Sequence, residues 1–115
     1  MDGVVVVLAS ADGDSDSCVG FLIARLVLDE AELLTIVSAP ECRRIGIARK
    51  LLEQMIEQLR YRDCKNVFLE VASTNDAARR LYEAHDFRIV GKRSGYYPKM
   101  AGSSGDALIM RCQLV

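Results

Sequence analysis

An apolar repeat with helical spacing lies between two strand-like segments in the middle of this 115-residue chain. The repeat begins at Arg44 and ends in the charged segment 60–65, and its spacing predicts an amphipathic helix. The segments 31–37 and 66–72 on either side are short and rich in Leu and Val. One helix between two strands predicts a parallel strand pair. The apolar positions of the helix are Ala48, Leu51, Leu52, Met55, Ile56 and Leu59.

The N-terminal third predicts antiparallel strands beside this pair. Segment 4–9 is a continuous apolar run, and a loop rich in Gly, Asp and Ser separates it from the strand-like segment 18–28. The adjacent Asp29 and Glu30 predict a tight turn into 31–37. We therefore expect antiparallel strands before the long helix.

The C-terminal half predicts a second helix over 76–84 and strands over 87–90 and 107–114. The side chains able to cap this helix are Ser73, Thr74 and Asn75. Those expected to be buried are Ala77, Ala78 and Leu81. The complete order is β-β-β-α-β-α-β-β, an α/β (α+β) fold with a mixed, mostly antiparallel sheet. Its parallel pair should form a ligand crevice at the carboxyl ends of the strands.

Length and charge limit the classes of function. The length fits a single domain over residues 1–115. The balance of 15 basic and 16 acidic residues argues against a general nucleic-acid binder. Residues 1–40 contain seven acids and one base, whereas residues 41–115 contain nine acids and fourteen bases. The second part of the chain is therefore expected to attract anions.

Membrane, secretion and metal signals are weak in this sequence. The apolar run 4–9 is too short to span a bilayer, and no basic region precedes it as in a secretion signal. We therefore expect a cytoplasmic protein without a membrane partner. The cysteines lack Cys-x-x-Cys spacing and the single histidine lacks a metal-ligand partner, so we expect reduced, mostly buried thiols and no metal. These residues are Cys18, Cys42, Cys64, Cys112 and His85.

Gly46 lies at the expected start of the long helix, among arginines. A glycine lets the backbone approach a ligand, and the free N–H groups and dipole of a helix start favour an anion. Arg43, Arg44 and Arg49 add positive charge. The pattern favours a pyrophosphate cradle, and a solvated helix cap is the alternative. The glycine patterns of P-loop and Rossmann nucleotide sites are absent from the sequence.

Glu70 is a carboxylate inside the apolar segment 66–72. Both faces of this segment are largely apolar, so we expect a central strand that is covered on both sides. Burial of a carboxylate is costly unless it is paired or used. The residues alone leave Glu70 as a catalytic group, a structural salt-bridge partner or a sheet-edge residue.

These features resemble the GNAT superfamily of acetyl-CoA-dependent N-acetyltransferases, whose pyrophosphate motif is Gln/Arg-x-x-Gly-x-Gly/Ala. Arg43, Gly46 and Ala48 fill its positions. More narrowly, the chain is similar to the bacterial ribosomal-protein-alanine N-acetyltransferases from Gly20 to Gln113. The blocks that carry this similarity include GFLIARLVLDEAELLTIV, FLEVASTNDAARRLYEAHDF and GYYP.

The resemblance implies that acetyl-CoA binds along the end of the third strand and the start of the long helix. The strand end would meet the pantetheine arm and acetyl carbonyl, with backbone N–H groups around Val37 as oxyanion donors. The arginine-glycine loop would surround the pyrophosphate, and Asn75 would contact the cofactor further along the arm. The expected cofactor-binding residues are Ile36, Val37, Ser38, Arg43, Arg44, Ile45, Gly46, Ile47, Ala48, Arg49 and Asn75.

The resemblance also implies that Glu70 is the general base and Tyr82 the general acid. An amine must lose a proton before it attacks a thioester, and the departing thiolate can take one from a phenol. The residues alone leave Tyr82 as either a packing residue or a functional one, and they favour packing. Tyr96 and Tyr97 correspond to a tyrosine pair near the family's acceptor groove, and packing is again the alternative.

Members of this family usually begin with a strand and two helices that precede the first hairpin, whereas this chain begins at the hairpin. We therefore expect part of the apolar sheet to be uncovered and the protein to self-associate, as a homodimer for example. The expected activity is acetyl transfer to a protein N-terminal amine, with an alanine-starting ribosomal protein as acceptor.

Three alternatives stay open. The first is a GNAT enzyme that acts on a small amine or a lysine side chain, and the second is an inactive acyl-CoA-binding module. The third is a ribosome- or RNA-associated protein that uses its basic half. This last reading lacks aromatic residues interleaved with the arginines, so we expect no direct nucleic-acid binding.

Overall fold

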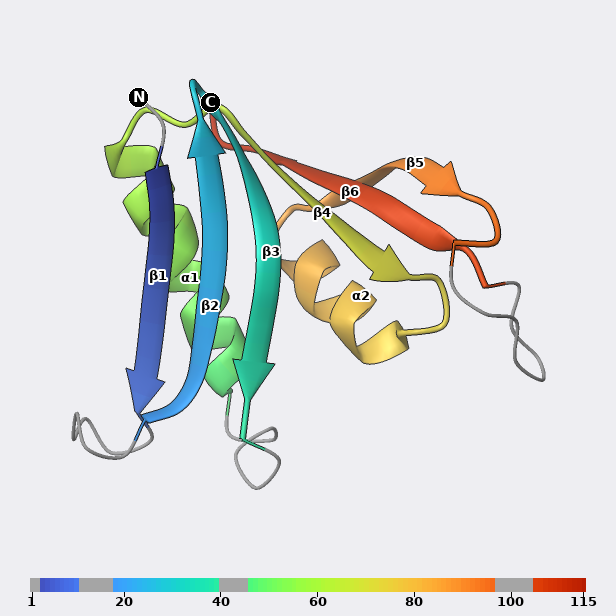
Figure 1. The fold of residues 1–115 in the computed structure, drawn as a ribbon, viewed down its shortest axis with the longest axis horizontal. Coiled ribbons are helices and arrows are strands. Elements are labelled where there is room, and N and C mark those ends of the chain that lie inside the picture. The colour runs from blue at the N-terminus through green and yellow to red at the C-terminus, as the bar shows by residue number, and fades with distance from the viewer. Residues whose placement is uncertain (1–2, 11–17, 40–45, 97–104) are drawn as a thin grey trace.

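A mixed six-stranded sheet is the framework of the fold in the computed structural model, which describes residues 3–10, 18–39, 46–96 and 105–115. Its strand order is β1-β2-β3-β4-β6-β5, with two helices (Figure 1). The strands are β1 (Gly3–Ser10), β2 (Cys18–Val27), β3 (Glu30–Ser38), β4 (Asn66–Ala72), β5 (Arg88–Arg93) and β6 (Ala107–Gln113), and the helices are α1 (Ile47–Tyr61) and α2 (Asp76–Ala84). The expected order and mixed sheet are confirmed.

β3 and β4 are the predicted parallel pair, but they are paired only near their first residues. Their register runs from Glu30 opposite Asn66 to Glu32 opposite Phe68. Beyond this point the strands diverge, and their arrowheads lie well apart in Figure 1. The divergence leaves backbone N–H and C=O groups of both facing edges outside the ladder between these two strands.

A bulge in β3 lies at the point of divergence. In the ladder between β2 and β3, Ala24 is opposite Leu33 and Ile23 is opposite Thr35, so Leu34 is an additional residue in β3. A bulge bends its strand and increases the local twist. It therefore supplies the bend with which β3 leaves β4, a feature that the sequence analysis did not predict.

Both helices cover the same face of the sheet. α1 packs against β1, β2 and β3, and His85 at the end of α2 reaches Glu53 on α1 with Nε2 3.0 Å from Oε2. The opposite face, which we call the open face, carries apolar side chains of β1 that are more than half exposed. They are Val4, Val6 and Leu8.

β4 is central in the sheet, as predicted, because it lies between β3 and β6. Its buried side chains alternate, so Leu69 and Val71 face the helices, while Phe68 is half-buried and Glu70 is exposed. Among the described residues, the prediction that both faces of this strand are covered is therefore wrong. The prediction relied on the apolar Phe68, but one apolar side chain does not distinguish a covered face from an open one.

α1 begins at Ile47 rather than at Arg44, because Gly46 has a left-handed conformation with φ 81° and ψ 19° that no α-helix continues through. The predicted apolar face is confirmed, except that Ala48 is only half-buried and Ile47 is buried instead.

α2 has the predicted bounds but a different buried face. Ala77 is exposed, which contradicts the prediction, while Ala78 and Leu81 are half-buried. Tyr82 is the residue that α2 buries, and its ring lies 5.7 Å from that of Phe87. The aromatic pair therefore sets the rotation of the helix. Neither helix in the described ranges is long and apolar enough to cross a membrane.

Candidate active site

A pocket of about 150 Å³ lies where β3 and β4 separate. Glu70 enters it from β4, Tyr82 from α2 and Ile36 from β3. The described residues that line it are Leu33, Leu34, Thr35, Ile36, Leu69, Glu70 and Tyr82. The pocket therefore brings the predicted base and the predicted acid to one place, between strands that would otherwise be joined by hydrogen bonds.

Glu70 reaches the pocket from the open face of the sheet. Its neighbours Leu69 and Val71 are buried against the helices, so the alternation of the strand directs Glu70 to the opposite side. Its side chain keeps 31% exposure, and its Oε1 lies 3.0 Å from Nη2 of Arg93 on β5. The carboxylate is therefore ion-paired and still accessible from the open face.

Tyr82 reaches the pocket from the helix side. The residue is 6% exposed, and burial raises the pKa of its phenol. Desolvation penalises the phenolate, so Tyr82 keeps its proton at neutral pH. The side chain can therefore donate a proton but is unsuited to act as a base.

The start of α1 has the features of an anion site. Gly46 precedes it without a side-chain cap, and the first turn contains no acidic residue. The Nη2 atom of Arg49 lies 3.7 Å from the position that a Cβ on Gly46 would occupy. Unpartnered N–H groups at a helix start and a nearby guanidinium together favour a phosphate group.

Gly20 brings this helix start to the end of β3. It is opposite Ser38 in the ladder between β2 and β3. A Cβ at this position would lie 2.8 Å from Ile47 Cγ2 and 2.8 Å from the carbonyl oxygen of Val37. Only a glycine permits this approach, so Gly20 helps to place the anion site beside Val37 and Ser38. A glycine inside a strand pattern is the signal that could have found it.

Comparison with known protein families identifies the family of this chain. The profile of the Acetyltransferase (GNAT) family matches residues 2–87. The chain belongs to this family. GNAT enzymes take their acetyl group from acetyl-CoA. Both the fold and the family agree with the resemblance seen in the sequence.

Several similar proteins are named as bacterial N-acetyltransferases. The [Ribosomal protein bS18]-alanine N-acetyltransferase of Haemophilus influenzae is 38% identical over 101 residues, which cover 88% of this chain and 68% of that protein. The Escherichia coli K12 protein of the same name is 42% identical over 90 residues, with 78% and 60% covered. Across four such relatives, the chain spans 60 to 70% of their length.

Two solved structures are similar over nearly the whole of this chain. The crystal structure of the Escherichia coli ribosomal-protein-S18-alanine N-acetyltransferase has a TM-score of 0.86 at 35% identity, with 96% of this chain and 69% of that chain covered. Arabidopsis thaliana NAA60, in complex with a bisubstrate analogue, has a TM-score of 0.77 at 25% identity, with 96% and 75% covered.

The residues predicted to hold the donor fall into two groups. Arg43, Arg44 and Ile45 lie outside the described residues. The others lie at three places around the diverging strands. These are the end of β3 (Ile36, Val37, Ser38), the start of α1 (Gly46, Ile47, Ala48, Arg49) and the start of α2 (Asn75). The side chain of Ile47 is buried, so that residue has only its backbone to offer a ligand.

Asn75 is held at the turn between β4 and α2. Its Oδ1 accepts a hydrogen bond of 3.2 Å from the backbone N–H of Ala78, so it caps the helix as predicted. This contact leaves the two side-chain amide N–H groups as donors for a ligand. The capping and cofactor-binding predictions are therefore compatible with each other.

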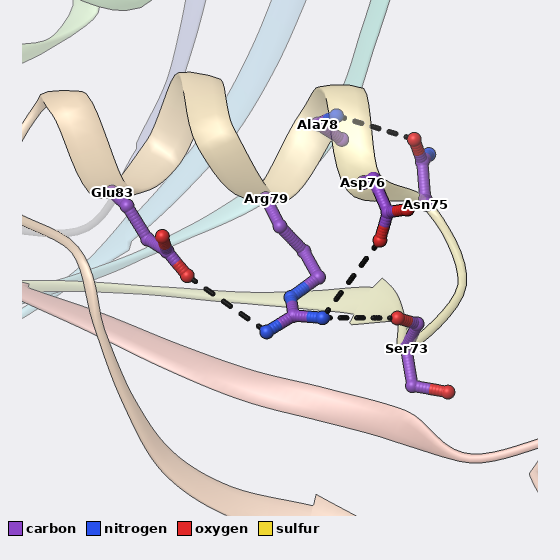
Figure 2. Close-up of polar contacts among 6 residues, drawn as sticks. All are labelled: Ser73, Asn75, Asp76, Ala78, Arg79 and Glu83. Carbon is purple, nitrogen blue, oxygen red and sulfur yellow. Dashed lines mark hydrogen bonds and ion pairs between the residues drawn. The ribbon is translucent and has the colours of Figure 1, made fainter.

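Arg79 braces the same turn, as Figure 2 shows. Its Nη1 donates to the backbone oxygen of Ser73 at 3.2 Å. Its guanidinium also lies 3.9 Å from Asp76 and 3.9 Å from Glu83. The arginine therefore connects the end of β4 to two turns of α2 and fixes the loop that presents Asn75.

Arg93 and Tyr96 extend the site across the open face. The guanidinium of Arg93 lies 4.6 Å from the ring centroid of Tyr96 as well as beside Glu70. Tyr96 is half exposed, and Tyr97 lies outside the described residues. Arg93 could not be identified from the sequence, because the charge pattern of β5 gives no sign of a partner on β4.

His85 lies in a different and larger hollow of about 460 Å³ between the helices. Its Nδ1 is 2.9 Å from the backbone oxygen of Leu81, and its Nε2 contacts Glu53. The imidazole therefore joins α2 to α1. Size alone does not identify the site, because this hollow contains neither Glu70 nor Tyr82.

The described thiols are structural. Cys64 and Cys112 are free and buried, and burial raises the pKa of both thiols. A raised pKa keeps them protonated and poorly reactive. Cys42 lies outside the described residues. The described parts of the chain contain no group of side chains that could hold a metal ion.

Proposed function

We propose that this protein, as one acetyltransferase domain, transfers an acetyl group from acetyl-CoA to the α-amine of a protein N-terminus. The observation that carries this proposal is the pocket between the diverging strands, which Glu70 enters from one face of the sheet and Tyr82 from the other. The start of α1 beside the end of β3 supports a donor site that leads into the same pocket.

Glu70 would act as the general base. It takes the proton of the acceptor amine, directly or through a water molecule, and the amine nitrogen then forms a bond to the acetyl carbon. The carbon–sulfur bond breaks, and Tyr82 donates its phenolic proton to the departing thiolate. Placing a base and an acid on opposite sides of the reacting atoms suits this order of proton transfers.

The donor would lie along the edge that β3 exposes after it leaves β4. Backbone N–H groups around Val37 would stabilise the negative charge that develops on the acetyl oxygen. Gly46, Ala48 and Arg49 would hold the diphosphate at the helix start. Asn75 would donate a side-chain amide N–H to the pantetheine arm.

An alanine-starting ribosomal protein is the proposed acceptor. The relatives from Haemophilus influenzae and Escherichia coli are named for the alanine of ribosomal protein bS18, and their similarity supports the same acceptor class here. The pocket is small, which suits a short first side chain. A ribosomal acceptor also favours a cytoplasmic location.

We further propose self-association through the open face. The apolar side chains of β1 on this face are exposed, and β1 is an edge strand of the sheet formed by the described residues; such surfaces commonly become interfaces. Light scattering at micromolar concentration should give a mass above that of the 12.7 kDa chain. A monomer at that concentration would contradict this part of the proposal.

Mass spectrometry of an alanine-starting peptide incubated with acetyl-CoA tests the main proposal. The matched controls are the same peptide with a blocked N-terminus and a lysine side chain, and the same peptide with a free N-terminus and no lysine. We expect acetylation of the free N-terminus and none of the lysine. Transfer to the lysine alone, or binding of CoA without transfer to any amine, would overturn the proposal.

A further inference from the structure

Arg93 makes an unusual contact, because it reaches Glu70 across an intervening strand. Glu70 lies on β4 and Arg93 on β5, and β6 separates them in the sheet. Neighbouring strands are about 4.8 Å apart, so the side chain must extend over about 10 Å of sheet surface. The resulting Nη2 to Oε1 distance is 3.0 Å.

The surface between the two residues is shaped for this contact. Ile109 on β6 is opposite both Glu70 and Gly91, so these three residues form one row across the open face. A Cβ on Gly91 would come within 3.3 Å of the Ile109 side chain. Because Gly91 has no side chain, it leaves room for the Arg93 side chain to cross the sheet. The Tyr96 ring contacts the Arg93 guanidinium, with its centroid 4.6 Å from Cζ.

We propose that Arg93 is a positioning residue that pairs with Oε1 of Glu70 and balances the charge of the carboxylate. An acceptor amine then binds next to Glu70 in its neutral form. This inference rests on the proposed function and specifies how the site selects the reactive form of the acceptor. An α-amine has a pKa of about 7.7 to 8.0, so most of it is ammonium at pH 7.

An unpaired carboxylate would bind the ammonium form, which has no lone pair for attack. The guanidinium next to Glu70 repels a second cation and leaves Oε2 to receive the proton. Among the described residues, the ionisable groups at this site are the Glu70 carboxylate, the Arg93 guanidinium and the neutral phenol of Tyr82.

Arg93→Gln tests this role with two acceptor analogues that cannot react. In one peptide the N-terminal amine is trimethylated, so it is permanently cationic. In the other peptide a hydrogen atom replaces the amine, so this end of the peptide is neutral. Inhibition constants of both are measured against acetylation of the ordinary peptide. Arg25→Gln is the matched control, because Arg25 also pairs with a glutamate at 3.0 Å, outside the pocket.

We expect Arg93→Gln to bind the cationic peptide at least about fivefold more tightly than the wild type, through loss of one repulsive charge. The neutral peptide should bind equally to both, and kcat for the ordinary peptide should fall while KM stays level or falls. A purely structural role would move both analogues together. Equal shifts for the two analogues, or no shift for the cationic one, overturn the inference. A wild type that acetylates no peptide overturns the proposed function and this inference with it.

Discussion

Among the described residues, two arginine–glutamate pairs lie on the open face of the sheet, and the comparison between them separates an ordinary surface contact from a site. Arg25–Glu32 and Arg93–Glu70 each have a nitrogen to oxygen distance of 3.0 Å. Arg25 and Glu32 are opposite each other on neighbouring strands, with both side chains more than half exposed. Exposed pairs of this kind contribute about 0–1 kcal/mol to stability.

The Arg93–Glu70 pair differs in what surrounds it. It crosses β6, its glutamate side chain is only 31% exposed, and that side chain lines a pocket with the buried phenol of Tyr82. Distance alone would rank the two pairs as equal. The divergence of β3 and β4 is what makes one of them chemically relevant, because it opens a route through the sheet to a proton donor.

Replacing the glutamate of each pair in turn should give the largest difference between the two pairs. We expect Glu70→Gln to lower kcat/KM for an alanine-starting peptide by about a hundredfold or more, the scale associated with loss of proton transfer. Glu32→Gln should leave it unchanged. Steady-state acetylation assays measure both, and thermal unfolding checks that each variant folds. Equal activity of the two variants would remove Glu70 from the mechanism.

Tyr82→Phe tests the second member of the pocket and should have a smaller effect on rate. A thiolate is a good leaving group and can depart before it is protonated, so we expect kcat to fall by about tenfold, below the usual range for loss of proton transfer. A variant with full kcat would assign Tyr82 to packing against Phe87 alone.

Tyr82→Phe should also make the free energy of unfolding less sensitive to high pH. Burial raises the pKa of Tyr82 above its ordinary value of 10.0, so the native state holds this proton more tightly than the unfolded state. The tyrosine's contribution is complete below pH 10 and is lost as the pH rises through the native pKa. Chemical unfolding at pH 8 and pH 10.5 should show the wild type losing more stability than Tyr82→Phe.

Much of this framework could be predicted from the sequence, because it depends on local periodicity. The 3.6-residue repeat located α1, and the single crossover helix predicted that β3 and β4 are parallel. Glu70 was a candidate because a carboxylate in an apolar strand is unusual. All of these signals lie within one continuous stretch of the chain, residues 31–72.

The features that turn this framework into a site depend on contacts between distant segments. The bulge at Leu34 exists only relative to the register of β2. The Arg93–Glu70 contact depends on β6 being inserted between β4 and β5, an order that no local pattern specifies. The buried face of α2 was mispredicted at Ala77 for the same reason, since Phe87 determines which side of the helix packs.

A substitution in the proposed donor site should lower CoA affinity while it leaves both ion pairs intact. Gly46→Ala places a Cβ on a residue with φ 81° and 3.7 Å from the Arg49 guanidinium, and the left-handed backbone costs about 1–2 kcal/mol for a residue with a side chain. We expect CoA affinity measured by calorimetry to fall severalfold. Gly95→Ala carries a similar backbone penalty at φ 67° with nothing within 4 Å, so its CoA affinity should match the wild type. Equal losses in both variants would assign the effect to general destabilisation.

The smallest expected effect belongs to the pair outside the pocket. Arg25→Gln removes a charge whose partner is half exposed and already solvated, so the free energy of unfolding should change by less than about 1 kcal/mol. The difference should shrink further at 1 M salt, where the Debye length is about 3 Å. Denaturant unfolding at low and high salt measures this, alongside the acetylation rate, which should not change. If Arg25→Gln instead reduced the rate as much as Arg93→Gln, the general charge of the open face would matter to the reaction, and the special position of Glu70 at the diverging strands would not explain it.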